Sequence, residues 1–189
     1  MKKLPALFYG LVFAAFPFVA NAQQSAFKID KITPTFIDSP EYQVSNVAHQ
    51  KQGATTAKWL EVEVQFEAAL DTDELTVKYY VFLNKTLLSG EVTHVNVSKG
   101  QELYSVMYVT PQTVTKLMEG HPATPSAVKD VGIELAVKGQ VVARLSSKSG
   151  FAEQWWTQMQ QTPGELLNKN ETPFAPLYWD RYPQIKAEH

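Results

Sequence analysis

The sequence predicts a mainly β domain that folds as an antiparallel β-sandwich. Apolar residues from Leu60 to Phe66 alternate with polar ones, a period of two that a strand buries on one face and a helix could not. A second pair of alternating segments, 131–137 and 141–145, flanks Lys138-Gly139-Gln140 and predicts a hairpin. Short strand-like segments recur about every ten residues, which favours a sandwich or barrel over alternating βαβ units.

Residues 1–22 have the features of an export signal. Lys2 and Lys3 precede an apolar run from Leu4 to Ala20, and Ala20-Asn21-Ala22 offers small residues for cleavage. Two prolines interrupt the run, and it is shorter than the roughly 20 residues that span a bilayer, so cleavage is favoured over a retained anchor. No cysteine follows to carry a lipid, and a classical pilin would be cut before its apolar run. We expect a mature chain without a stable membrane anchor, exported to the periplasm, the cell surface or the medium.

The first half of the mature chain alternates strands with polar turns. A first strand is expected around Phe27, Ile29 and Ile32, and Pro34 would break it. Residues 36–57 are expected to form a long loop with a short strand near 42–47. After the strand over 60–66, residues 71–74 form a turn, and apolar residues at every second position predict a strand over 75–83.

The next segments continue this pattern and add one helix. Asn84-Lys85 and Ser89-Gly90 are expected to be turns before a strand over 91–97. Residues 102–109 are rich in tyrosine and β-branched side chains and predict a further strand. Thr110 as N-cap and Pro111 at the first helical position then predict a short helix, which ends before the hairpin.

The composition changes at residue 150. Phe151, Trp155 and Met159 recur every four residues and predict a helix, and Thr162-Pro163-Gly164-Glu165 has the form of a capping box for a second short helix. The prolines that follow prevent regular structure, while the aromatic side chains among them need an apolar cover. We divide the chain into a signal peptide (1–22), a β-sandwich domain (23–149) and a C-terminal helical segment and tail (150–189) that packs on the sandwich.

The preferred fold class is therefore an immunoglobulin-like antiparallel β-sandwich with a short inserted helix and a C-terminal helix plus an irregular aromatic tail. The chain contains no cysteine, so the disulfide of antibody domains is absent and the match is architectural. A domain of this length can be stabilised by burial alone.

Charge and composition narrow the classes of partner. The chain has 17 basic and 19 acidic side chains, without a basic block, and two of the lysines belong to the signal. Nucleic acid or an anionic membrane is therefore not expected as the main partner. The absence of cysteine also excludes thiolate metal sites and cysteine nucleophiles.

No group of residues predicts a catalytic, cofactor or metal site. The histidines lack the spacing of metal ligands on a helix, and Asp71, Asp73 and Glu74 lack the rest of a calcium loop, so a solvated turn is favoured. The serine elbow of hydrolases is absent. Paired carboxylates stay open because their separation depends on the fold, although Glu61, Glu63 and Glu67 are more simply the solvated face of a strand. The histidines are His49, His94, His121 and His189.

The C-terminal aromatic residues are the one feature with a functional interpretation. They could bind a protein partner or stack against sugar rings, because aromatic side chains dominate interface hot spots. They could equally close one end of the sandwich as core, and core is favoured for Trp155. The residues that we predict to contact a partner are Trp156, Tyr178, Trp179 and Tyr182.

The chain resembles a family of exported immunoglobulin-like proteins encoded beside type IV pilus assembly genes in verrucomicrobial bacteria. Three parts carry the resemblance: the strand series from Trp59 to Leu145, the Phe151-Ala-Glu-Gln-Trp-Trp segment and the Pro173-Phe-Ala-Pro-Leu-Tyr-Trp-Asp-Arg-Tyr-Pro tail. The resemblance implies a non-enzymatic periplasmic or surface protein that assists a pilus system through protein contacts, with pilus components as partners. It transfers no functional residues.

Three hypotheses about function follow. The leading one is a binding or structural module without enzymatic activity, and docking by strand addition would require an uncovered sheet edge. The second is a carbohydrate-binding or carbohydrate-processing domain that uses exposed C-terminal aromatics. The third is an unrecognised hydrolase, which would need convergent carboxylates or a serine and histidine pair in one pocket.

Overall fold

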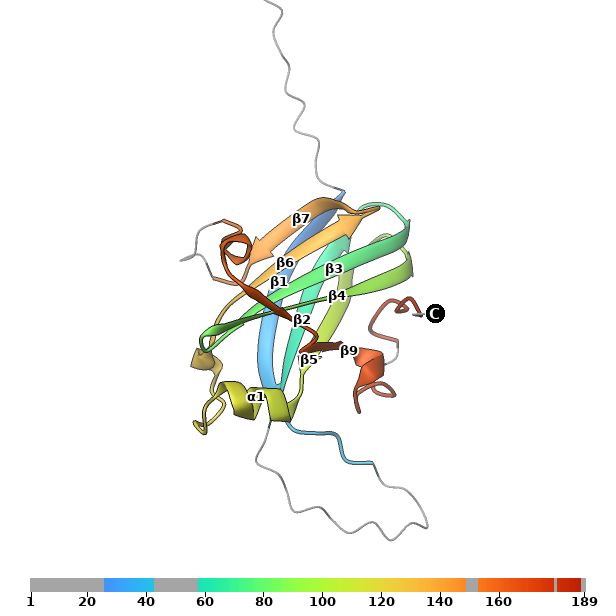
Figure 1. The fold of residues 1–189 in the computed structure, drawn as a ribbon. Coiled ribbons are helices and arrows are strands. Elements are labelled where there is room, and N and C mark those ends of the chain that lie inside the picture. The colour runs from blue at the N-terminus through green and yellow to red at the C-terminus, as the bar shows by residue number, and fades with distance from the viewer. Residues whose placement is uncertain (1–25, 43–57, 149–152, 179, 188–189) are drawn as a thin grey trace, which may run out of the picture.

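Two β-sheets form the body of the protein (Figure 1). The computed structural model describes residues 26–42, 58–148, 153–178 and 180–187, so the predicted signal peptide and Trp179 lie outside the described residues. The four-stranded sheet has the order β1 (Phe27–Ile37), β2 (Trp59–Ala68), β5 (Gly100–Val109), β9 (Leu166–Asn168). The five-stranded sheet has the order β7 (Gln140–Ser146), β6 (Val128–Val137), β3 (Thr72–Leu83), β4 (Thr86–Val97), β8 (Gln161–Pro163).

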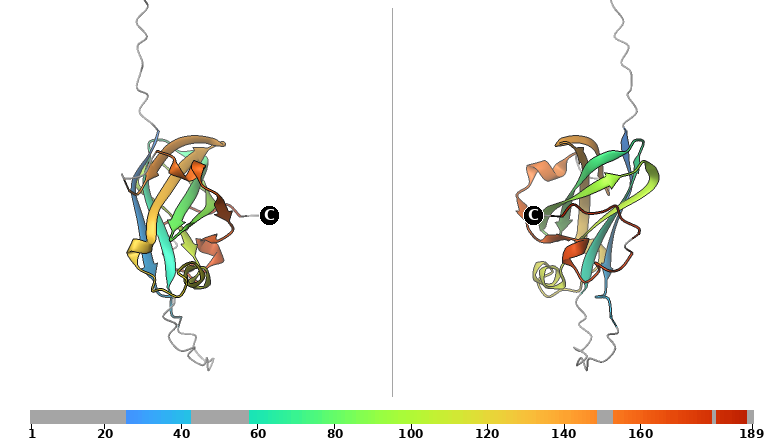
Figure 2. Two further views of the ribbon diagram at one scale, coloured as in Figure 1. Left: turned by 60° about the vertical axis from the view of Figure 1, so that its left-hand side comes forward. Right: turned by 90° about the vertical axis from the view of Figure 1, so that its right-hand side faces the viewer.

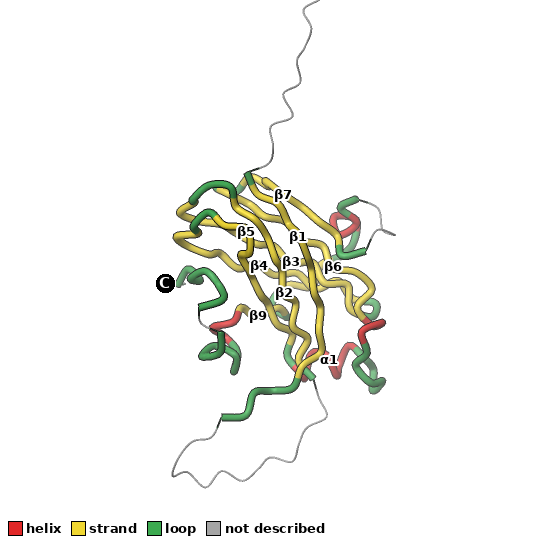
Figure 3. Tube along the Cα trace, turned by 180° about the vertical axis from the view of Figure 1, so that it is seen from behind, coloured by secondary structure: helices red, strands yellow, loops and turns green. Residues whose placement is uncertain are grey.

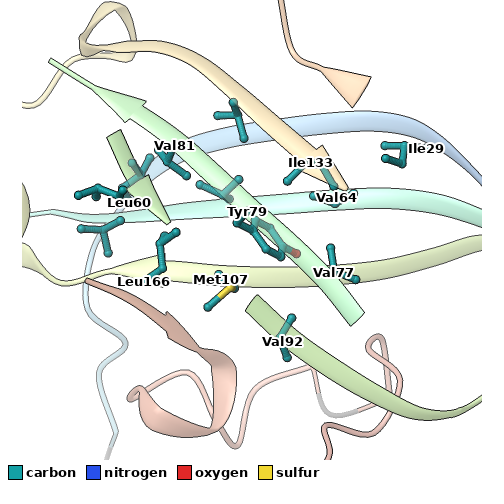
Figure 4. Packing of buried hydrophobic residues seen from close by; sticks show 14 of the residues in the cluster. Ile29, Leu60, Val64, Val77, Tyr79, Val81, Val92, Met107, Ile133 and Leu166 are labelled. Carbon is teal, nitrogen blue, oxygen red and sulfur yellow. The ribbon is translucent and has the colours of Figure 1, made fainter. Parts of the chain in front are cut away.

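The two sheets pack face to face around one apolar core, as the turned views in Figure 2 show. Alternate residues of β2, β3, β5 and β6 point inward, so the period of two in the sequence becomes the inner face of each sheet. Figure 4 shows side chains of both sheets meeting around the Tyr79 ring. Core residues with almost no exposed surface include Leu60, Val64, Val77, Tyr79, Val81, Met107 and Ile133.

The strongest local patterns formed the predicted elements. The alternating segment became β2, and Lys138 and Gly139, both with positive φ, turn the chain between β6 and β7. Helix α1 (Pro111–Leu117) begins as predicted, because the Thr110 side chain accepts a hydrogen bond from the Thr113 amide. Among the described residues it is the one α-helix, and three 3₁₀ turns accompany it: η1 (Pro125–Ala127), η2 (Trp155–Gln158) and η3 (Lys169–Glu171).

Three predicted strand boundaries were wrong, one of them the turn expected over 71–74, where β3 already begins at Thr72. Pro34 does not break β1, because β1 is an edge strand and an edge tolerates the missing amide donor. Ser89-Gly90 is not a turn, since β4 runs through it. A Cβ atom at Gly90 would lie 2.7 Å from the Leu166 Cβ, so this glycine lets β9 approach β4.

The predicted C-terminal helices were also wrong. The described part of the first one contains only the 3₁₀ turn η2, and the residues of the second form β8 and β9. Strand β8 pairs in parallel with β4, and β9 pairs antiparallel with β5. The capping box lies after the predicted one, at Asn168 and Glu171, around η3. Pairing with existing sheet edges therefore outweighed the local helix signal.

The C-terminal segment closes one side of the two-sheet body. It passes from β8 on the five-stranded sheet to β9 on the four-stranded sheet, as the orange and red ribbon in Figure 1 shows. Beyond η3, an isolated bridge joins Ile185 to His94 of β4. The Val95 amide donates to the Gln184 carbonyl and the Lys186 amide to the Thr93 carbonyl, each at 2.8 Å. Two parts of the β4 edge are thus covered, by β8 and by the tail.

The opposite side is formed by the edge strands β1 and β7, which lie beside each other (Figure 3). Neither has a further strand partner among the described residues. Strand β1 carries a bulge between Ile29 and Lys31 as well as Pro34, and β7 carries one between Val141 and Ala143. Bulges, charges and proline hinder the pairing of another strand. In the described residues no helix is both long and apolar enough to cross a membrane.

Candidate functional site

The outer face of the four-stranded sheet presents acidic and aromatic side chains together. We call it the acidic-aromatic face and define it by Trp59, Glu61 and Glu63 of β2 with Tyr104 and Tyr108 of β5. The antiparallel register places Tyr108 opposite Glu61, and Tyr104 opposite the residue two positions beyond Glu63. Since alternate residues share a face, the side chains lie on the surface opposite the core.

The C-terminal tail covers this face, and aromatic contacts form one part of the cover. Phe174 is buried and its ring stacks on Tyr108, with a centroid distance of 4.7 Å and an interplanar angle of 5°. The same ring meets Trp59 edge-on at 5.5 Å. The Trp59 indole donates a 2.8 Å hydrogen bond to the Ser39 hydroxyl, which fixes its orientation. Such aromatic pairs stabilise beyond the area that they bury.

Glu63 is the polar anchor of the tail. Arg181 donates to both Glu63 oxygens, from Nε at 2.9 Å and Nη2 at 2.8 Å, and the Tyr182 hydroxyl donates at 2.8 Å. The guanidinium also lies 3.8 Å from the centre of the Tyr104 ring, a cation–π contact. Burial alone would raise the pKa of Glu63, but the hydrogen bonds from Arg181 and Tyr182 outweigh it and lower the pKa.

Glu61 has a different environment. Its Oε2 atom accepts a 3.0 Å hydrogen bond from the Tyr108 hydroxyl. Burial raises the pKa of Glu61, and the hydrogen bond from Tyr108 only partly opposes this. Glu61 and Glu63 are thus not simply solvated, as the sequence suggested, because the tail lies over them. Each already accepts hydrogen bonds from tyrosine side chains.

We predict that Glu63→Gln loosens the end of the tail. An amide cannot replace the charged, bidentate contact with Arg181, which is partly exposed, so the effect on the whole fold should be small. The Lys186 amide, which is bonded to Thr93, should exchange with solvent about threefold faster in hydrogen-exchange measurements. Glu67→Gln, a more exposed glutamate of the same strand, is the matched control, and an equal change in both variants would contradict the prediction.

A buried chain of polar groups links the core to the tail. The Tyr79 hydroxyl donates to Ser105 Oγ at 2.7 Å, and Ser105 Oγ lies 2.8 Å from His94 Nε2. His94 Nδ1 lies 3.0 Å from the Pro183 carbonyl, which can only accept. Nδ1 therefore carries the proton, and Nε2 accepts from the Ser105 hydroxyl. Each of these hydrogen-bonded polar groups has a partner as long as His94 stays neutral.

His94 predicts a pH dependence of stability. Burial lowers the pKa of His94 from 6.5 to about 4, although its bond to Pro183 acts in the opposite direction. Between these values the unfolded chain binds a proton and the folded one does not. The free energy of unfolding should therefore decrease by up to about 3 kcal/mol as the pH falls from 6.5 to 4.

Urea unfolding at several pH values measures this slope. His94→Gln should remove the part of the pH dependence of unfolding that His94 causes, even if the variant is less stable overall. His121→Gln, which removes an exposed histidine, is the matched control variant. A wild-type slope that persists in His94→Gln would assign the dependence to other groups.

The outer face of the five-stranded sheet is covered by η2. Trp156 stacks on Tyr80 at 5.3 Å and an interplanar angle of 12°, and Trp155 meets Trp156 edge-on at 5.6 Å. Burial raises the pKa of Tyr80 to about 12, and the nearby Glu134 carboxylate raises it as well. Gly132 makes room for the indole, since a Cβ atom there would lie 2.2 Å from Trp156 Cε3.

Asp130 of β6 accepts hydrogen bonds from residues at and just after the end of β7, where the chain leads toward η2. It has no exposed surface, and its Oδ1 accepts from the Val131 amide at 2.8 Å, the Lys148 amide at 3.0 Å and the Ser147 hydroxyl at 2.6 Å. Its Oδ2 accepts from the Ser146 hydroxyl, which also receives a hydrogen bond from the Trp155 indole. Sequence reasoning did not identify Asp130, because no local pattern distinguishes it from a surface aspartate.

The structure separates the residues that we predicted to contact a partner. Trp156 is 2% exposed and belongs to the interior, whereas Tyr178 is 68% exposed. Tyr182 is half-buried and contacts Glu63, and Trp179 lies outside the described residues. Sequence reasoning missed Arg181 as the residue that anchors the tail. The alternation that placed Glu63 and Trp59 on one face was the available signal for the surface itself.

Tyr178 lies in a turn that is fixed at both ends. Its φ of 51° is in the left-handed region, which a bulky side chain rarely adopts. Its carbonyl accepts from the Arg181 amide at 3.1 Å, and the Leu177 amide donates to the Phe174 carbonyl at 2.9 Å. The turn is thus held against the sheet by Phe174 before it and Arg181 after it. In the described residues no cluster of His, Asp and Glu could hold a metal ion.

Fold and site together define a class: a mainly β protein of two sheets whose own C-terminal segment docks on the outer faces of both. A protein-family model matches residues 18–189, and the chain belongs to the family that this model describes.

One solved structure shares most of this fold. The crystal structure of a protein from Akkermansia muciniphila, a verrucomicrobium, is similar to this chain with a TM-score of 0.73 and 27% sequence identity. The similarity covers 88% of this chain and 95% of that chain. Among the curated proteins, none matched this sequence.

Proposed function

We propose that this protein is a non-enzymatic, immunoglobulin-like protein that is exported and acts by contacting another protein of the cell envelope. We further propose that this partner belongs to a type IV pilus system, as the resemblance of the sequence implies. The family match and the similarity to a verrucomicrobial protein support a relationship between this chain and proteins of such bacteria. The two-sheet architecture is compatible with an immunoglobulin-like fold.

The observation that carries the proposal is the placement of Tyr178. A large aromatic side chain, 68% exposed, projects from a left-handed turn that is anchored on both sides. Strained conformations persist where the surrounding structure enforces them, and they concentrate at functional positions. A rigidly presented tyrosine also suits a protein interface, because it offers contact area at little cost in conformational entropy.

Two features support contact through this surface rather than strand addition. The tail and β8 already occupy parts of the β4 edge, and β9 occupies part of the β5 edge. The edges of β1 and β7 carry the bulges and proline that hinder pairing. A partner that docks on the surface around Tyr178 does not have to pair with any of these sheet edges.

The absence of enzymatic activity is part of the proposal. Ser105 and His94 are the one serine and histidine pair that we find in the described residues, and they are 0% and 1% exposed. A nucleophile must reach its substrate, and here the tail carbonyl of Pro183 covers the histidine. The pair is better explained as a buried polar link.

Affinity capture from an envelope extract tests the proposal. Wild-type protein and Tyr178→Ala are used as baits, with Leu70→Ala as the control because Leu70 is another large hydrophobic residue that is exposed, at 47% against 68% for Tyr178. We expect wild type and Leu70→Ala to retain a pilus component that Tyr178→Ala loses. Equal retention by all three baits would contradict the proposed surface, and a glycan-dependent change in tryptophan fluorescence would favour carbohydrate binding instead.

A further inference from the structure

The acidic-aromatic face recognises a specific peptide, which here is the tail of the same chain. Phe174 stacks on Tyr108, while Arg181 binds Glu63 with two hydrogen bonds and lies over Tyr104. None of these contacts is covalent, and the hydrogen-bonding partners Glu63 and Arg181 are 118 positions apart in sequence. A face that binds this peptide within one chain offers the same groups to the peptide of another.

The residues after Tyr178 form the most specific part of this peptide. They supply the Arg181 and Tyr182 contacts with Glu63 and the Pro183 carbonyl that accepts from His94. They also supply the backbone pairing of Gln184 and Lys186 with β4. Charge, aromatic stacking and strand register must all match at once. An unrelated peptide would need the same groups in the same order.

Tyr178 is the point at which the tail can change direction. Its left-handed conformation is disfavoured by the Cβ atom, and the reversed turn that it makes brings Arg181 back onto the face of its own chain. If Tyr178 adopted an extended conformation, this strain would disappear and residues 180–187 would point away from their own sheet. Strained connections of this kind favour the exchange of a terminal segment between two copies of a chain.

We propose that residues 180–187 dock reciprocally on a second copy of this chain, which gives a dimer by exchange of the tail. Each copy then supplies Arg181 to the other copy's Glu63 and pairs its Lys186 with the other copy's Thr93. Exchange forms no new kinds of contact, so the relief of strain at Tyr178 must offset the entropy cost of association. The dimer is therefore concentration-dependent. This self-association does not depend on the proposed envelope partner. Because exchange gives up the left-handed turn at Tyr178, the chain with its tail docked on its own sheet is the form that presents Tyr178 to that partner.

Single-cysteine variants of the full chain test the exchange, because the natural sequence has no cysteine. Thr93 and Lys186 are neighbours across the antiparallel pairing, where Cα atoms lie about 5 Å apart and a disulfide can form. Thr93→Cys and Lys186→Cys proteins are mixed under mild oxidation. The covalent heterodimer should form about tenfold faster than from Thr93→Cys mixed with Leu70→Cys, since docking raises the effective concentration of the thiols.

Two variants of Tyr178 sharpen the test. Tyr178→Gly makes the left-handed turn favourable and should suppress the cross-link, whereas Tyr178→Pro excludes positive φ and should enhance it. Equal rates for the Lys186→Cys and Leu70→Cys mixtures in the natural Tyr178 background would overturn the proposal. Because that comparison needs no change at Tyr178, it holds even if Tyr178→Pro fails to fold. Loss of the envelope partner with cross-linking retained would reject only the proposed function.

Discussion

Trp156→Ala is expected to lower the free energy of unfolding by about 4 kcal/mol, in the range for removal of a buried aromatic side chain. The indole is 2% exposed, stacks on Tyr80 and fills the space that Gly132 leaves open. Its Nε1 has no hydrogen-bond partner among the described residues, so the loss is one of packing rather than hydrogen bonding. Urea unfolding followed by circular dichroism measures the change.

Two further variants separate packing from general sensitivity of the region. Trp156→Phe keeps the stack on Tyr80 and should cost less than half as much. Gly132→Ala should be destabilising by about 1–3 kcal/mol, because its Cβ atom would overlap the indole, and it should be tolerated once Trp156 is already alanine. Additive effects of Gly132→Ala and Trp156→Ala would contradict the close contact.

Asp130→Ala is expected to destabilise the protein by a similar amount, about 4 kcal/mol. Removal of the carboxylate takes this acceptor from the buried Val131 amide and from the part-buried Lys148 amide and Ser147 hydroxyl, and a buried donor left unpaired costs about 1–3 kcal/mol. The loss of stability should be largest near Lys148, where the C-terminal segment begins. Chemical denaturation gives the total, and hydrogen exchange at the Lys148 amide localises it.

Asp130→Asn is the matched control for this prediction. The amide oxygen can still accept from the Val131 and Lys148 amides, while the amide nitrogen replaces the acceptor that faces Ser146. We expect about half of the loss seen with alanine. A loss as large in asparagine as in alanine would show that the charge, and not the number of acceptors, stabilises this corner.

The sequence predicted the elements whose signals are local. Alternation over 60–66 predicted β2, and Thr110 with Pro111 predicted the start of α1, because in both cases neighbouring residues determine the outcome. The hairpin of β6 and β7 was predicted for the same reason, with Lys138-Gly139 as its turn. The position of the one described α-helix between β5 and β6 also follows from these signals.

The C-terminal segment could not be predicted in this way. Thr162 to Glu165 has the pattern of a helix start, but the surrounding residues instead complete two sheets whose edge strands lie far away in the sequence. Each added strand has only three residues, too few for a recognisable alternation. Tertiary pairing decides such short strands, and no single-sequence pattern encodes it.

The candidate site was partly predictable. The face that carries Glu61 and Glu63 followed from the period of two, and the need of the tail aromatics for a cover followed from their number. Which tail residues cover the acidic-aromatic face did not follow from the sequence, because Arg181 and Glu63, which are in contact, lie 118 positions apart. Trp156 could be placed in the interior only once Gly132, a glycine inside a strand, was seen to receive its ring.

The way the tail closes the β4 edge also affects when the protein can finish folding. Pro183 supplies the acceptor for His94, and Ile185 forms an isolated bridge to β4, so contacts of β4 depend on residues that follow every strand of both sheets in the sequence. Until these residues dock, His94 and this part of the β4 edge lack their partners. The last contacts of the fold therefore require the closure of a long loop, which slows their formation.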